Sequence, residues 1–150
     1  MQGKENIERQ VGRRLRDGQL KSLYENGKVM DLINASFLKF DNEWVRIVCT
    51  DEQTMVDIEN LEIKEYNMRD CEFEFRVQPI EKVFPGFTKY LDKKLLGFKE
   101  LVLKNSEFMS FGLNLYFEDN LNFIIRNHDY PRDENEFYFE TVDFDDLIEK

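Results

Sequence analysis

The chain has 150 residues, of which 31 are acidic and 21 are Lys or Arg, so its formal net charge at pH 7 is −10. This charge argues against general binding to nucleic acids or to anionic membrane surfaces, because both need a surplus of Lys and Arg. Fourteen Phe, six Tyr and one Trp argue against intrinsic disorder. The length is typical of one domain, and we expect residues 1–150 to form a single one.

The cysteines and the first residues bear on where the protein resides. The first ten residues lack the apolar stretch of a secretory signal, and no apolar run is long enough to span a bilayer. Cys49 and Cys71 are too far apart for a CxxC redox motif, and two cysteines with one histidine do not form a zinc motif. We expect both thiols to be reduced and buried, in a cytoplasmic protein.

The N-terminal segment, residues 1–28, is expected to be mainly helical. Apolar residues recur with a helical period over residues 5–25, although Gly12 and Gly18 weaken a helix. The pair Asn26-Gly27 either ends this helix with a left-handed cap or turns a hairpin. The periodicity favours the helix.

Residues 29–150 have the pattern of a β-rich core. Stretches in which apolar and polar residues alternate, or in which large apolar residues gather, are bounded by turn residues. Together with a short helix near residues 87–95 and a final helical turn over 143–149, they predict an α+β fold of mainly antiparallel sheet, with about seven or eight strands. The stretches are residues 29–40, 44–50, 54–58, 71–77, 98–103, 111–117, 121–125 and 136–142.

Two of these stretches resemble each other. Residues 45–51 and 113–119 both alternate into an acidic turn, after which the chain returns through 56–58 and 123–125. The similarity indicates either two related three-strand units or two unrelated hairpins that obey the same period of two. The sequence leaves both open.

The chain offers little for catalysis. His128 is the only histidine, and none of the serines lies in a G-x-S-x-G motif. Phosphate-binding and dinucleotide-binding glycine motifs do not occur, and neither does a zinc-ligand spacing. We therefore predict no catalytic residues, no cofactor and no metal. An enzyme that uses His128 with neighbouring carboxylates is the least favoured alternative.

Charge is unevenly distributed along the chain. Residues 118–150 contain eleven acidic and three basic residues, interleaved with aromatic ones. Such a surface either attracts a basic partner or keeps a Phe-rich domain soluble. Arg13, Arg14 and Arg16 form the one basic cluster, which we expect to be a solvated face lying against the acidic region. The candidate partner-binding residues are Tyr130, Asp133, Glu134, Glu136, Tyr138, Glu140, Asp143, Asp145 and Asp146.

The strand pattern at residues 44–47 and 112–119 resembles that of small, acidic, β-rich bacterial proteins of the polymorphic-toxin immunity type. The resemblance extends over residues 29–140. It implies a protein that binds a toxin domain, often a basic nuclease, and blocks its active site. We therefore expect a soluble, immunity-like inhibitor with a basic protein partner. A structural or adaptor protein of a phage or mobile element is the alternative.

Overall fold

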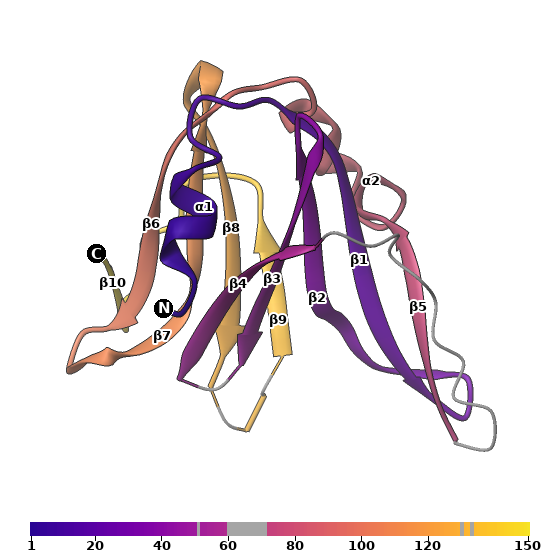
Figure 1. Cartoon of the computed structure of the whole chain (residues 1–150). Coiled ribbons are helices and arrows are strands. Elements are labelled where there is room, and N and C mark those ends of the chain that lie inside the picture. Colours follow the sequence, from indigo (N-terminus) through magenta and orange to yellow (C-terminus); the bar gives the residue numbers. More distant parts are fainter. Residues whose placement is uncertain (51, 60–71, 130, 133) are drawn as a thin grey trace.

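The computed structural model of the chain consists of two antiparallel sheets of five strands each (Figure 1). It describes residues 1–50, 52–59, 72–129, 131–132 and 134–150, with residue 107 described in its backbone only. Within these residues there are ten strands, and the longest helix has six residues. The prediction of a mainly antiparallel β fold is confirmed. None of the described helices is long and apolar enough to cross a membrane.

The first sheet is a meander to which a fifth strand is added beside the first strand. Its members are β1 (Leu15–Glu25), β2 (Lys28–Phe40), β3 (Glu43–Thr50), β4 (Gln53–Glu59) and β5 (Phe73–Pro79). The spatial order is β4-β3-β2-β1-β5, so that β1 has a partner on each side. Cys71, which the sequence placed in the last of these strands, lies outside the described residues.

The second sheet repeats this arrangement. Its members are β6 (Leu95–Leu103), β7 (Ser106–Phe117), β8 (Leu121–His128), β9 (Glu134–Tyr138) and β10 (Leu147–Glu149), in the order β10-β6-β7-β8-β9. The two hairpins that resemble each other in sequence occupy different places in this scheme. β3 and β4 are the third and fourth strands of their meander, whereas β7 and β8 are the second and third of theirs. The repeating topological unit therefore has five strands. The two similar hairpins do not occupy equivalent positions in the two units.

The predicted N-terminal helix is wrong. Only α1 (Lys4–Glu8) is helical, and residues 15–25 form β1. Pairing with strands on both sides outweighs the weak helical period of this segment. Asn26 and Gly27 both have positive φ, 49° and 76°, and they turn the hairpin between β1 and β2.

Two other helix predictions are also corrected. The middle of the chain has the short helix α2 (Ile80–Val83) and a 3-10 turn, η1 (Pro85–Tyr90), and a strand is already present at Leu95. A second 3-10 turn, η2 (Glu118–Asn120), links β7 and β8. The segment expected to form a final helical turn instead supplies strand β10, because its main chain pairs with β6.

The two sheets are joined where β1 and β6 begin. The main-chain N–H of Leu15 donates to the carbonyl of Lys93, and the N–H of Leu95 donates to the carbonyl of Arg13, both over 2.9 Å. Phe40 and Phe117 are the register partners of Leu15 and Leu95, and their rings stack at 6.5 Å between centroids. We call these four side chains and the two hydrogen bonds the joint.

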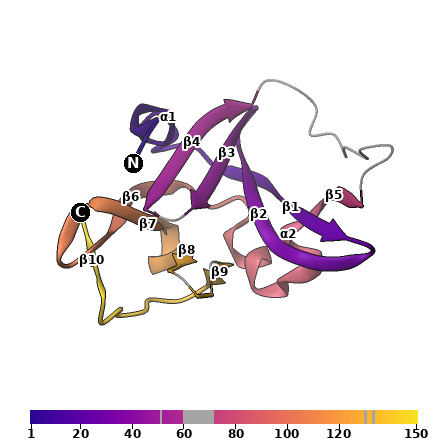
Figure 2. The same cartoon turned by 90° about the horizontal axis from the view of Figure 1, so that it is seen from below.

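One apolar cluster extends from the joint between the sheets. It combines buried side chains of both sheets with Ile7 of α1, Ile80 of α2, and Phe87 and Tyr90 of η1. From the joint, β1, β2 and β5 diverge from β8 and β9 (Figures 1 and 2). Away from the joint, the asparagines Asn34, Asn127 and Asn135 lie between the two layers.

Gly18 lies where η1 packs on β1, and a methyl group there would have no room. A Cβ at this position would lie 2.4 Å from Cζ of Phe87, whereas a Cβ at Gly97 of β6 would meet no atom within 4 Å. We expect Gly18→Ala to lower the free energy of unfolding by about 1–3 kcal/mol through overpacking. Gly97→Ala is the matched control and should leave it unchanged or slightly raised. Urea unfolding of the two variants measures the difference, and equal stabilities would contradict the packing.

Cys49 is buried in β3, and burial raises the pKa of its thiol to about 12. In a Cys71→Ser background, we expect this thiol to react with a disulfide reagent at pH 8 only after denaturant unfolds the protein, because the thiolate is the reacting species. Stoichiometric reaction of the folded protein within minutes would be the opposite result.

Candidate functional site

Residues 139–146 form a strap across the outer face of the second sheet. They connect β9 at one edge of this sheet with β10 at the other edge (Figure 2). Phe144 and the adjoining Leu147 hold the segment down, in an apolar cluster with Leu101, Phe111 and Ile124 that is separate from the main core. The C-terminal acidic residues are therefore displayed on a fixed segment.

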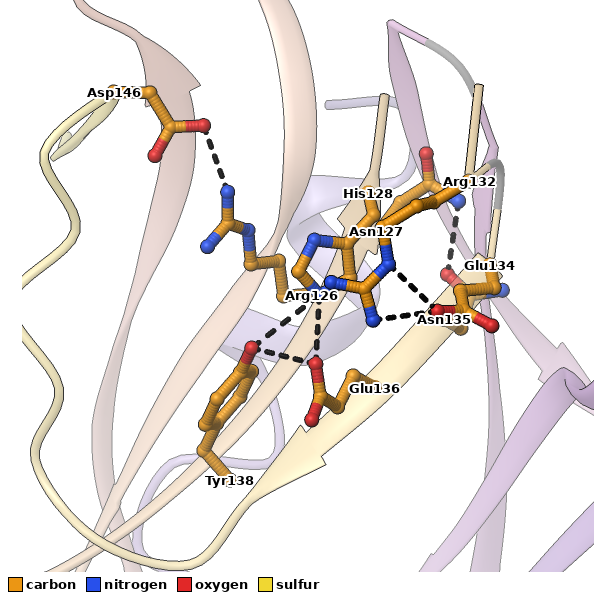
Figure 3. Close-up of polar contacts among 9 residues, drawn as sticks. All are labelled: Arg126, Asn127, His128, Arg132, Glu134, Asn135, Glu136, Tyr138 and Asp146. Atoms are coloured by element: carbon orange, nitrogen blue, oxygen red, sulfur yellow. Dashed lines mark hydrogen bonds and ion pairs between the residues drawn. The ribbon is translucent and has the colours of Figure 1, made fainter. Parts of the chain in front are cut away.

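Arg126 of β8 anchors the strap through an ion pair and through a cation–π contact of its planar guanidinium group. Its Nη2 lies 2.7 Å from Oδ2 of Asp146 (Figure 3). Its guanidinium also lies 4.5 Å from the ring centroid of Phe144. Phe144 also meets the ring of Tyr138 edge-on at 5.4 Å. From the other side, the main-chain N–H of Lys104 donates to the Asp146 carbonyl over 3.0 Å. Sequence reasoning missed Arg126, whose only signal is a cation at an outward position of β8.

His128, Glu136 and Tyr138 form a polar cluster beside the strap. Oε2 of Glu136 lies 2.7 Å from Nε2 of His128 and accepts a hydrogen bond from the Tyr138 hydroxyl over 2.7 Å (Figure 3). Burial acts to raise the pKa of Glu136, but the hydrogen bonds from Tyr138 and His128 outweigh it, and the pKa is lowered. Burial and the adjacent Glu136 carboxylate raise the pKa of Tyr138 to about 12.

Those of the predicted binding residues that the structure describes divide into two groups. Glu134 and Asp146 are in ion pairs with Arg132 and Arg126, and Glu136 and Tyr138 are hydrogen-bonded within the polar cluster. Among the described residues, no ion pair involves Glu140, Asp143 or Asp145, which are exposed on the strap. Tyr130 and Asp133 lie outside the described residues. Three of the predicted residues therefore remain without an ion pair among the described residues, and all three lie on the strap.

A groove of about 530 Å³ runs beside the strap. Its apolar wall includes Leu101, Val142 and Ile148, and Asp143 and Glu149 supply carboxylates. Ile148 is 38% exposed. Lys104 also lines the groove, but its ammonium donates to the Asp145 carbonyl over 2.6 Å. The groove combines apolar area with an acidic border.

The basic cluster lies at the joint, and its charges are paired. Arg13 contacts Glu43 at 3.3 Å, Arg16 contacts Asp92 at 2.5 Å, and Arg14 contacts Glu118 at 3.4 Å. Within the described residues, Arg14 is the only member of the cluster that contacts the acidic residues 118–150, so the expected contact between the two regions is limited to one residue there.

Three observations bear on chemistry at this site. Within the described residues, no group of three His, Cys, Asp or Glu side chains could hold a metal ion. His128 is not among the residues that line the strap groove, nor among those that line two clefts of about 370 and 570 Å³ between the sheets. Comparisons with models of protein families, with curated proteins and with solved structures find no match to this chain.

The Glu136 cluster makes stability depend on pH in a defined direction. A lowered pKa in the folded state means that the cluster stabilises the protein above the ordinary carboxyl pKa of 4.5, and that this stabilisation is lost as the pH falls through the lowered value. We expect Glu136→Gln to be less stable than the wild type at about pH 6, with the gap closing toward about pH 3.

Urea unfolding at a series of pH values measures this gap. Glu140→Gln is the control, because it removes an exposed strap carboxylate with no ion pair in the described residues. A gap for Glu136→Gln that stays constant across the pH series would contradict the role of the carboxylate.

Proposed function

We propose that this protein is a non-catalytic binding protein of the immunity type, which neutralises a basic protein partner by covering it with the strap and the groove beside it. The observation that carries the proposal is the set of three exposed strap carboxylates, Glu140, Asp143 and Asp145, for which the described residues provide no ion-pair partner. Carboxylates left in this state attract cations from a distance and orient them on approach.

The groove beside the strap adds apolar contact area to the charged surface. Leu101, Val142 and Ile148 offer apolar area next to the carboxylates, and interfaces derive much of their affinity from such buried centres with polar surroundings. Phe144 and Arg126 keep the strap in place. The strap therefore loses little conformational entropy when the partner binds. A basic partner with apolar residues in its contact region fits this surface.

The environment of His128 favours binding over catalysis. Its Nε2 is engaged by Glu136 and lies 3.3 Å from the Tyr138 hydroxyl, and the imidazole is 12% exposed. A general base needs access to a substrate proton. This geometry supports a structural role for His128 in holding β8 and β9 together.

The strap charges are tested by neutralising them together. We expect Glu140→Gln, Asp143→Asn and Asp145→Asn, combined in one variant, to slow association with the partner by about tenfold at low salt and to flatten its salt dependence, with the fold intact. The tagged full chain is used to capture partners from extracts of its own cells, and association rates of the purified partner are then measured at about 0.02 M and about 0.15 M salt.

The matched control carries the same change in net charge at other sites. Glu5, Glu52 and Glu72 are exposed and, within the described residues, have no ion pair. Their combined change to Gln should leave most of the rate enhancement intact. Equal slowing in both variants would make net charge the cause, and unchanged rates in the strap variant would remove the strap from the interface.

A further inference from the structure

Strand β10 is an edge strand of the second sheet, and among the described residues one of its two sides has no partner strand. It pairs with β6 alone, at the outer edge of the sheet (Figure 1). The edges formed by β4 and β9 each meet another part of the chain. Gln2 forms a bridge with Met55 of β4, and the side chain of Asn135 of β9 donates to the carbonyl of Ile33 in β2. An uncovered strand edge is a template for pairing with another chain.

The hydrogen bonds between β10 and β6 show which main-chain groups face the free side. Lys150 and Glu100 exchange two main-chain hydrogen bonds, of 2.9 and 3.1 Å, and the N–H of Lys104 donates to the carbonyl of Asp146. In an antiparallel ladder, the hydrogen-bonded positions alternate along each strand. Positions 146, 148 and 150 therefore direct their N–H and C=O groups toward β6, whereas positions 147 and 149 direct theirs away from it.

The accessible part of this free edge centres on Glu149. Ile148 and Glu149 are exposed, whereas Leu147 is buried. The two carboxylate oxygens of Glu149 accept hydrogen bonds from Nδ2 of Asn114 and from the hydroxyl of Tyr116, both over 2.6 Å. Within the described residues no ion pair neutralises this carboxylate. The free edge therefore presents a negative charge in a fixed position.

The charge beside this edge decides between a second copy of the chain and a basic partner. Asp143 lines the same groove as Glu149, and Asp145 is exposed on the adjoining part of the strap. A second copy would bring the same carboxylates against these, and like charges that face each other destabilise a strand pair. A strand with a lysine or arginine opposite Glu149 brings the opposite charge. The occupant that fits is a basic strand.

We infer that a basic strand of the partner adds to the free side of β10, antiparallel to it, and exchanges main-chain hydrogen bonds with Glu149. This inference rests on the proposed function, because the strand belongs to the partner that covers the strap and its groove. Directly opposite side chains of an antiparallel pair lie on the same face of the sheet. The strand residue opposite Glu149 is therefore a lysine or arginine, and the one opposite the exposed Ile148 is apolar. Main-chain pairing supplies affinity, and these side chains supply specificity.

A short capped peptide that alternates lysine with valine tests this pairing. With its lysines on the face of Glu149, the lysine N–H groups point at the free edge of β10. We expect the full chain to bind this peptide with a Kd on the order of 1 mM at about 0.02 M salt. In the saturated complex, hydrogen exchange of the Glu149 amide, followed by NMR, should slow about tenfold.

Two N-methylated peptides separate strand pairing from attraction by charge alone, because their charge and side chains are the same. N-methyl groups on the lysines remove the N–H groups that face β10, and binding should weaken at least about tenfold. N-methyl groups on the valines change the opposite side of the peptide, and binding should stay within about twofold. Equal binding of the two methylated peptides, or no binding of the unmodified one, would overturn the inference.

Variants of the chain supply a second test. Glu149→Gln removes the charge and should weaken binding of the lysine–valine peptide about threefold or more. Glu149→Pro also removes an N–H that points away from β6, and should weaken it about tenfold with the fold intact. If this variant does not fold, Glu149→Gln and the methylated peptides decide. Glu72→Gln is the control, because it changes an exposed carboxylate elsewhere. Unchanged binding to Glu149→Gln, or equal weakening in the control, would contradict the assignment.

The captured partner tells failure of this inference apart from failure of the strap proposal. If the strap variant slows association but Glu149→Pro and Glu149→Gln leave the affinity for the partner unchanged, pairing at β10 is overturned and the strap stands. If the Glu149 variants weaken partner binding about tenfold and the strap variant associates normally, the strap charges are removed from the interface and pairing at β10 stands.

Discussion

The joint between β1 and β6 is the constraint on which the rest of the structure depends. Two reciprocal main-chain hydrogen bonds tie the start of each sheet to the segment that precedes the other, and the rings of Phe40 and Phe117 stack beside them. This turns the same face of both five-stranded units inward. A chain with one alanine and many aromatic residues can then fill the space between the sheets with large side chains from both layers, and Tyr90 and Phe123 pack there at 5.6 Å between ring centroids.

Local ion pairs determine which charges remain exposed. The basic residues that precede β1 and β6 are paired locally, as in the contact of Lys93 with Asp119 at 2.5 Å and of Arg14 with Glu118. Away from the joint, Arg126 is used to anchor the strap and Arg132 pairs with Glu134. Glu140, Asp143 and Asp145 of the strap are exposed and have no ion pair among the described residues.

The sequence predicted strands well where large apolar side chains alternate with polar ones, as in β3 and β4. It failed at β1 because two of the inward positions of this strand are Gly18 and Ser22, whose small side chains hide a period of two. The composition predicted that acidic residues gather near the C-terminus. It did not predict which of these carboxylates are in ion pairs. Asp146 is neutralised by Arg126, which lies 20 residues away in the chain and in another strand. An isolated asparagine carries no sequence pattern, so the hydrogen bond between Asn127 and Asn135 was not predictable.

By itself, the sequence determined that the protein is mainly antiparallel β, that its core is aromatic, and that acidic residues gather near its C-terminus. Local alternation and composition carry this information, since each strand needs only its own residues to define two faces. The tertiary structure alone decided that residues 15–25 form a strand, that ten strands divide into two like units, and which acidic residues are in ion pairs. These outcomes depend on contacts between residues far apart in the chain, whose energies outweigh the weak preferences of any single segment.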